Sequence, residues 1–234
     1  PAGGRGRVEF QAVSFGYHED VDQAVLREFS LTIEPGESVA LVGATGSGKT
    51  TTLYATLRYI ATHGGATGGG DLNIMTIEDP IEHEIPGASQ VEVDASDKVS
   101  FSRALRSILR HDPDVIMLGE IRDAETAELA IKAALTGHLV FSTLHTNTAA
   151  GVVTRLIDMG VEPFLVAATL RLAVAQRLVR RLCSKCKTKA PLGSAEASSL
   201  GVPQLADHDV YENFGCVYCA GKGFVGRAAL FEML

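Results

Sequence analysis

One short segment constrains the fold of this 234-residue chain more than any other. Residues 43–50 have the sequence GATGSGKT, which matches the pattern G-x-x-x-x-G-K-[ST] at every fixed position. The segment follows the apolar run 37–43 and precedes a stretch of helical periodicity from Lys49, in which Leu53 and Leu57 share a face. Glycines let the backbone curve around phosphate groups, and the helix directs its positive dipole end at them. The segment predicts a nucleotide-binding loop.

ATP and Mg²⁺ are the cofactors expected at this loop. Lys49 is expected to reach the β- and γ-phosphates, and the Thr50 hydroxyl to bind Mg²⁺. The alternative is a glycine-rich turn between a strand and a helix that binds no ligand. The residues expected to contact ATP are Gly43, Ala44, Thr45, Gly46, Ser47, Gly48, Lys49, Thr50 and Thr51.

Strand-like and helix-like segments alternate along the chain. Alternation of this kind predicts parallel strands joined by helical crossovers, and hence an α/β fold with a mostly parallel sheet. From Cys183 the sequence changes to short polar pieces, which indicates a domain boundary there. Strands are expected at 7–17, 29–35, 37–43, 72–78, 115–120 and 139–144, and helices from 49 onward and at 100–110, 124–135, 148–159 and 163–182.

Two acidic groups follow apolar strands and are candidates for hydrolysis. The first is the segment EDPIE at 78–82, and the second is Glu120. Ligands of open parallel sheets gather at the carboxyl ends of strands, so both groups are expected to converge on the phosphates. The alternatives are that Glu82 and Glu120 cap helices or lie on a solvated face. Asp123 is expected to cap the helix at 124–135.

A histidine and several arginines are further candidates. His145 follows the strand at 139–144 and is expected to hydrogen-bond a phosphate, whereas His138 begins that strand and is expected at the opposite edge. The arginines could supply charge to a γ-phosphate within or between subunits, or form a solvated basic face. They are Arg103, Arg106, Arg110, Arg122 and Arg155.

All four cysteines fall in two C-x-x-C pairs, Cys183 with Cys186 and Cys216 with Cys219, separated by 29 residues. Two such pairs suit tetrahedral Zn²⁺ bound by four thiolates, although the separation exceeds the usual spacing. Disulfides are the alternative, and a chain without an export signal disfavours them. We expect one structural zinc.

Composition and charge limit the classes of protein to which the chain can belong. Hydrophobic residues are 46% and charged residues 21% of the sequence, which excludes wholesale disorder. The net charge of −7 argues against a general nucleic-acid binder. Residues 1–8 lack a signal-peptide pattern, and the longest apolar stretch, 164–179, is interrupted by Arg171 and Arg177. These features predict a soluble, cytoplasmic protein.

Several motifs together resemble the ATPases of type II secretion systems and of type IV pilus assembly. They are TGSGKTTTLYATL, TIEDPIE, LRSILRHDPDVIMLGEIRDAETAELAIKAALTGHLVFSTLHTN, TRLIDMGVEPFLVAATL and AQRLVRRLC. The resemblance covers about residues 40–234. It implies a RecA-like P-loop NTPase core, a homo-hexameric ring, and ATP hydrolysis coupled to the movement of pilin-like subunits. It also implies platform partners at the inner membrane, with the chain peripheral to that membrane.

The resemblance assigns roles to individual residues. The segment 43–50 corresponds to the Walker A loop, 78–82 to the acidic Asp box, and 136–147 to the histidine box. Glu82 would then be the general base, and Glu120, the Walker B glutamate, would order Mg²⁺ and its water. The C-terminal segment GCVYCAGKGFVGR resembles the tetracysteine segment of this family, where the zinc would be structural.

Residues 7–42 instead resemble the opening of an ABC-transporter nucleotide-binding domain, which implies that Tyr17 stacks on adenine. The signature LSGGQ of that class is absent from the sequence. The expected domains are an N-terminal β segment (1–42), the ATPase core (43–182) and a zinc-binding subdomain (183–234). The leading function is a secretion or pilus-assembly motor. The alternatives are an ABC-type transporter subunit and a zinc-bearing module that binds nucleotide with poor turnover.

Overall fold

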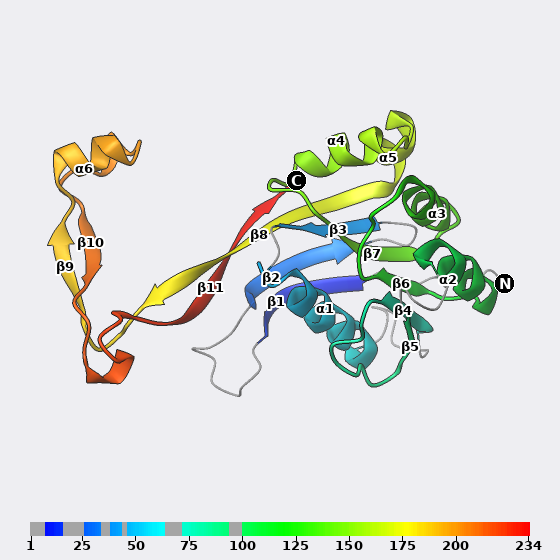
Figure 1. Cartoon of the computed structure of the whole chain (residues 1–234), viewed down its shortest axis with the longest axis horizontal. Helices are drawn as coiled ribbons and strands as arrows, with labels where there is room; N and C mark the ends of the chain where they lie inside the picture. The colour runs from blue at the N-terminus through cyan, green and yellow to red at the C-terminus, as the bar shows by residue number, and fades with distance from the viewer. Residues whose placement is uncertain (1–7, 16–25, 34–37, 44–45, 64–71, 94–99) are drawn as a thin grey trace. The chain divides into compact units, whose positions relative to one another are not determined.

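A seven-stranded sheet carries the loop that is predicted to bind nucleotide in the computed structural model of the chain (Figure 1). The structure describes residues 8–15, 26–33, 38–43, 46–63, 72–93 and 100–234. The strands of the sheet are β3 (Ser38–Val42), β4 (Ile74–Glu78), β5 (Ala88–Glu92), β6 (Val115–Leu118), β7 (Leu139–Leu144), β8 (Leu170–Leu182) and β11 (Phe224–Met233).

The strand order is β11-β8-β3-β7-β6-β4-β5. β3 pairs in parallel with both β7 and β8, and β6 pairs in parallel with β7 and β4, which in turn pairs in parallel with β5. Parallel strands of this kind need crossover connections, and their central members are buried on both faces. The predicted α/β fold with a mostly parallel sheet is confirmed.

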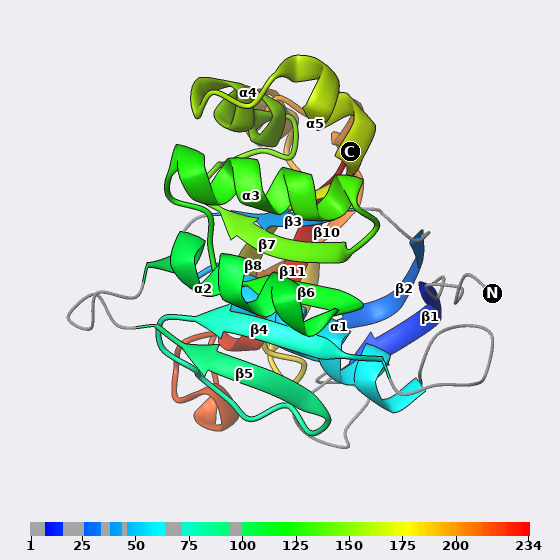
Figure 2. The same cartoon turned by 90° about the vertical axis from the view of Figure 1, so that its right-hand side faces the viewer.

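Helices cover both faces of the sheet. Since successive side chains along a strand point to opposite faces, each strand contributes to the core on both sides. In β3, Ala40 and Val42 join a core cluster with helices α2 to α5. Val39 and Leu41 join a second cluster with α1. α2 and α3 lie side by side over the sheet (Figure 2). The helices are α1 (Lys49–His63), α2 (Phe101–Ile108), α3 (Ala124–Leu135), α4 (Gly151–Asp158) and α5 (Pro163–Thr169), and a 3-10 turn, Leu109–His111, follows α2.

The helix expected at 163–182 is confirmed only for Pro163–Thr169, which form α5, and is wrong beyond it, because strand β8 follows. An apolar run of this kind fits a buried strand as well as a helix. The structure shows a period of two: Ala173 and Ala175 contribute to one core cluster, and Leu172 and Val174 to the other. Pairing with β3 therefore determines the conformation of this segment.

The chain divides into two compact units, residues 1–177 with 229–234 and residues 178–228. The second unit contains an antiparallel pair, β9 (Lys187–Pro191) with β10 (Asp209–Asn213), and helix α6 (Ser194–Ser199). In the first unit, β1 (Val8–Phe15) and β2 (Leu26–Ile33) pair as a separate antiparallel hairpin. None of the helices in the described part of the chain combines the length and the apolar character needed to span a membrane.

Asp123 caps helix α3, as the sequence predicts. Its backbone is extended, and its carboxylate accepts hydrogen bonds from the N–H of Thr126 at 2.8 Å and from the hydroxyl of Thr126 at 3.0 Å. The cap satisfies one of the main-chain donors that an isolated helix end leaves without a partner. It also fixes the point at which the chain leaves the loop after β6 and enters the helix.

We predict that Asp123→Ala lowers the free energy of unfolding by about 1 kcal/mol, because the helix loses its cap. Asp123→Ser is the matched control, since a serine hydroxyl also caps, and it is expected to lose less than half as much. Urea unfolding followed by circular dichroism measures both variants. Equal losses for the alanine and serine variants would contradict the capping role.

Candidate functional site

Four strands end at one edge of the sheet and bring the candidate residues there. β3, β7, β6 and β4 are successive neighbours and all parallel, so their carboxyl ends face the same way. The loop 43–50 follows β3, His145 follows β7, Glu120 follows β6, and the segment 79–82 follows β4. Residues distant in the sequence thus meet at a single edge.

Hydrogen bonds tie these strand ends to one another. The N–H of Gly119 donates to the carbonyl of Ile77 at 2.8 Å, and the N–H of Ile121 donates to the carbonyl of Thr143 at 3.0 Å. The Thr143 hydroxyl in turn donates to the carbonyl of Gly119 at 2.7 Å. The loops that carry the polar groups therefore begin from fixed positions.

Gly43 opens the phosphate loop at a place where no other residue fits. Its φ is +146°, and a Cβ atom there would lie 2.5 Å from the carbonyl oxygen of Gln176 and 2.6 Å from Oγ of Ser47. Because the first of these atoms belongs to the backbone, it cannot move aside easily. Ala44, Thr45 and the proposed adenine contact Tyr17 lie outside the described residues.

Lys49 is buried at the start of α1, with 8% of its surface exposed. Its ammonium donates to the carbonyl of Gly43 at 2.5 Å and to that of Leu144 at 3.4 Å. Burial lowers the pKa of the Lys49 ammonium from its ordinary value, and the nearby Glu120 carboxylate partly opposes this shift. The lysine thus holds positive charge between the ends of β3 and β7.

The loop also fits a phosphate group. The Ser47 hydroxyl is buried and has no hydrogen-bond partner among the described residues. Gly46 and Gly48 have φ of +77° and +84°, which lets the backbone curve tightly before α1. A phosphate oxygen is the kind of acceptor that such a hydroxyl and helix N-terminus favour. Thr50 and Thr51 follow on the first turn of α1 and are half-buried.

Glu120 lies at the centre of a small ionic network. Its carboxylate, 15% exposed, pairs with the Arg122 guanidinium and contacts His145 Nε2 at 2.8 Å. Arg122 also pairs with Asp79 at 3.6 Å and so joins the loops after β6 and β4. Burial opposes ionisation, but hydrogen bonds from Arg122 and His145 hold the pKa of the Glu120 carboxyl below its ordinary value. Glu120 is therefore a carboxylate at neutral pH.

Tyr54 connects α1 to the loop that carries Glu82. Its side chain is 4% exposed, and its hydroxyl donates to the Glu78 carboxylate. The same oxygen accepts from the N–H of Glu82 at 3.0 Å and from the N–H of His83 at 3.3 Å. Burial and the bond to Glu78 raise the pKa of Tyr54 to about 12, so the hydroxyl keeps its proton at neutral pH.

Glu78 is buried, with 3% of its surface exposed, and is surrounded by donors. Besides Tyr54, it accepts from the Thr76 hydroxyl at 2.5 Å and from Nε2 of Gln90 at 2.9 Å. Gln90 also bonds the main chain of the same loop, at the carbonyl of His83 and the N–H of Ile85. The first acidic residue of the segment 78–82 is thus a structural anchor, whereas Glu82 is exposed.

The remaining candidates lie apart from these groups. His138 is buried just before β7, at the end of that strand opposite to His145 as expected, and its Nδ1 contacts the carbonyl of Ala133 at 2.9 Å. Arg106 forms an ion pair with Glu125 at 2.7 Å. Arg110 and Arg155 are exposed and form no ion pair with any described residue.

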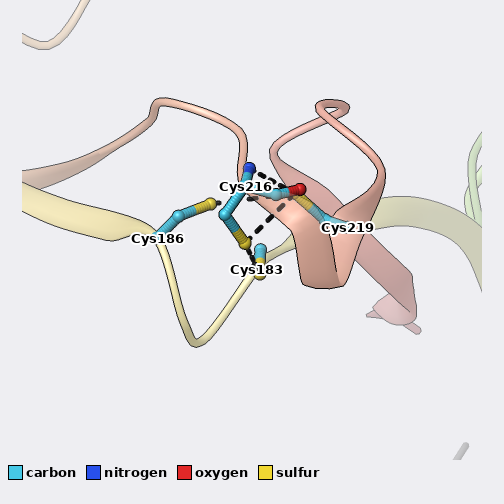
Figure 3. Close-up of side chains that lie close together, drawn as sticks. All are labelled: Cys183, Cys186, Cys216 and Cys219. Atoms are coloured by element: carbon cyan, nitrogen blue, oxygen red, sulfur yellow. Dashed lines mark hydrogen bonds between the residues drawn. The ribbon is translucent and has the colours of Figure 1, made fainter.

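The four cysteines gather in the second unit (Figure 3). All are free thiols, and their sulfur atoms lie within 4.8 Å of one another. Three sulfur pairs are separated by 3.7 to 3.9 Å. Tetrahedral coordination at a Zn–S distance of about 2.3 Å places sulfur atoms about 3.8 Å apart. The cysteines are close enough to hold one metal ion.

Backbone donors surround one of these sulfurs. The N–H groups of Cys216 and Gly223 donate to Cys219 Sγ at 3.1 and 3.2 Å. Burial disfavours the thiolate, but these donors outweigh it and lower the pKa of Cys219 to about 6. Cys219 is thus favoured as the deprotonated sulfur that a metal requires, whereas burial and hydrogen bonds with the neighbouring thiols raise the pKa of Cys186 to about 12.

Two polar residues of the site escape sequence reasoning. Tyr54 occupies a core position of α1, and a buried tyrosine hydroxyl needs a partner, which was the available signal. Gln176, fully buried in β8, accepts from the Thr52 hydroxyl at 2.8 Å. The sequence signal for Gln176 is a single amide side chain within an apolar run. Because that run predicts a helix, the place of Gln176 in a buried strand is not foreseen.

Known sequences that resemble this chain include secretion and pilus-assembly proteins. A family model described as "Type II/IV secretion system protein" matches residues 7–234, which include the segment that resembles an ABC-transporter domain. A putative type II secretion system protein E of Escherichia coli strain K12 is 50% identical over 200 residues, which is 86% of this chain and 39% of that protein. The type IV pilus assembly ATPase PilB of Myxococcus xanthus is 50% identical over 203 residues, 86% of this chain and 35% of PilB.

Solved structures that resemble the chain include a pilus motor and an ATPase. The pilus retraction motor PilT with bound ADP aligns with a TM-score of 0.56 at 28% identity, over 98% of this chain and 63% of PilT. The ATPase DotB of Legionella pneumophila aligns with a TM-score of 0.53 at 35% identity, over 62% of this chain and 42% of DotB. The chain spans about two fifths of the curated relatives' length. It belongs to the type II/IV secretion system protein family.

Proposed function

We propose that the chain is the ATP-hydrolysing motor domain of a type II secretion or type IV pilus assembly machine. The observation that carries the proposal is that β3, β7, β6 and β4 end at one sheet edge, so that the loop 43–50, the Glu120 network and the loop bearing the exposed Glu82 all start from it. Phosphoryl transfer needs positioned positive charge on the phosphates and an acidic group that orients water. Both are available at this edge, and the named relatives are secretion proteins and a pilus ATPase.

The residues divide the chemistry between them. Residues 43–51 would hold ATP, with Lys49 neutralising the β- and γ-phosphates and Thr50 binding Mg²⁺. Glu120 stays ionised and would order Mg²⁺ and its water. Glu82, exposed on its loop, would accept the proton of the attacking water. His145, hydrogen-bonded to Glu120, would contact the γ-phosphate and sense its loss. Bound Mg²⁺ would supply charge neutralisation during transfer.

The assembly is part of the same proposal. We place the chain in a homo-hexamer on the cytoplasmic side of the inner membrane, attached through platform proteins, with pilin-like subunits as cargo. The exposed arginines Arg110 and Arg155, which have no described ion-pair partner, are available to a γ-phosphate across a subunit boundary. We also propose the domain bounds that the sequence predicts: an N-terminal β segment at 1–42, the ATPase core at 43–182 and a zinc-binding subdomain at 183–234. The family match over 7–234 does not favour the ABC-type alternative.

Zn²⁺ is the metal we propose for the four cysteines. Their sulfur spacing suits tetrahedral coordination, and four thiolates are a structural zinc set. The four thiolates would fill the coordination sphere of the ion, and the ion would hold the two C-x-x-C turns together. Because no coordination position stays open for water, we assign it no catalytic step.

A pair of substitutions tests the nucleotide site. Lys49→Ala is expected to weaken ATP binding by about tenfold to a hundredfold, because a charge-assisted contact to phosphate is lost. Glu82→Gln is expected to retain binding while hydrolysis falls by about a hundredfold or more, the usual contribution of a general base. Calorimetric titration with ATP and a phosphate-release assay measure the two effects.

Matched controls separate these effects from general damage. Lys132→Ala removes an exposed lysine that pairs with Glu128, and Glu84→Gln changes an exposed carboxylate two residues from Glu82. Both controls should keep wild-type binding and turnover. Turnover that survives both test substitutions would show the site assignment to be wrong. Nucleotide binding without turnover in the wild-type chain would instead favour the zinc-bearing nucleotide-binding module.

Metal analysis tests the cysteine site. The chain purified under reducing conditions is expected to contain about one zinc per chain by elemental mass spectrometry. Cys219→Ser should lose most of it, because one of four ligands is removed, and a chelator should release thiols that react with a colorimetric reagent. Zinc-free wild-type protein, or disulfides detected by mass spectrometry, would contradict the assignment.

A further inference from the structure

We propose that Tyr54 is a positioning residue for the hydrolysis: its hydroxyl holds the loop that carries Glu82 against α1, the helix that begins in the phosphate loop. The inference rests on the proposed function, since it concerns the placement of the general base. It adds a residue to which no role was assigned by the motifs.

The direction of the Tyr54 hydrogen bonds follows from its neighbours. A tyrosine hydroxyl donates one hydrogen bond and accepts at its oxygen. The main-chain N–H groups of Glu82 and His83 can only donate to the Tyr54 oxygen, so the Tyr54 proton points to the Glu78 carboxylate. The oxygen of Tyr54 then faces the main-chain N–H groups of Glu82 and His83 as an acceptor. Glu78, Tyr54 and the loop form one chain of hydrogen bonds with a set direction.

Glu82 depends on its main chain for its position. Its side chain is exposed and makes no hydrogen bond or ion pair with the described residues. The bond from its N–H to Tyr54 therefore fixes the main chain from which the Glu82 carboxylate extends. The ring of His83 packs edge-on against the Tyr54 ring, with centroids 5.6 Å apart, and adds a second contact from the same loop.

The helix joins this anchor to the phosphates. Lys49 and Tyr54 lie on the same helix, α1, five positions apart, which is about 7.5 Å along the axis at 1.5 Å per residue. A buried helix of this kind moves as one body, because Leu53, Leu57 and Ile60 pack it against the sheet. Lys49, which would bind phosphate, lies on α1, and the loop that carries Glu82 is hydrogen-bonded to the same helix through Tyr54.

Kinetics of Tyr54→Phe test the inference. The phenylalanine keeps the ring and removes only the hydroxyl, so kcat is expected to fall by about tenfold to a hundredfold while ATP affinity stays within about twofold. In a Glu82→Gln background the same change should cost less than about twofold more, because the two residues act through one step. Tyr59→Phe, which removes a hydroxyl from the same helix, should leave kcat unchanged.

Hydrogen exchange provides a readout that needs no turnover. In Tyr54→Phe, the amides of Glu82 and His83 lose their acceptor and should exchange about fivefold faster or more. The amide of Ile121, bonded to Thr143, should not change. Unchanged exchange at Glu82 and His83, or a kcat loss that adds fully to that of Glu82→Gln, would overturn the inference. Absent wild-type turnover would count against the proposed function alone, since the exchange result still decides whether Tyr54 holds the loop.

Discussion

Parallel hydrogen bonding among β3, β7, β6 and β4 determines where each candidate catalytic group lies. Four neighbouring parallel strands must end at one edge, so the loops after them meet whatever their separation in sequence. The segment 43–50, His145, Glu120 and the segment 79–82 lie at or near the start of those loops. The site is therefore a consequence of strand order, and single side chains refine it.

Charged side chains at this edge lie close to one another and balance each other's charge. Lys49 is buried at the start of α1, and its positive charge lies near the ionised Glu120, whose own charge is balanced by Arg122. Arg122 also reaches Asp79, so the carboxylates after β6 and β4 share one cation. A buried lysine and a carboxylate held ionised are suited to an anionic phosphate with its metal ion. In the second unit, backbone N–H groups similarly prepare a cysteine sulfur for a metal.

The sequence alone predicts the local features well and the pairing-dependent features poorly. The cap at Asp123, the strand at 139–144 and the place of the segment 43–50 between a strand and a helix follow from motifs and periodicity, and the structure has them at those positions. The segment 163–182 fails, because β8 becomes a strand only through its pairing with β3. The roles of Tyr54 and Glu78 could not be foreseen either, since their contacts join α1 to β4 and depend on the packed sheet.

Paramagnetic broadening by Mn²⁺ bound with a non-hydrolysable ATP analogue tests most directly whether the four strand ends build one nucleotide site. Amide signals of Gly48, Glu120 and His145 should broaden strongly. Those of Asn73, Asp114 and His138, at the opposite ends of β4, β6 and β7, should persist, because a strand of five residues spans about 17 Å. Broadening that is strongest at Asn73 and Asp114, or uniform along the strands, would contradict the account.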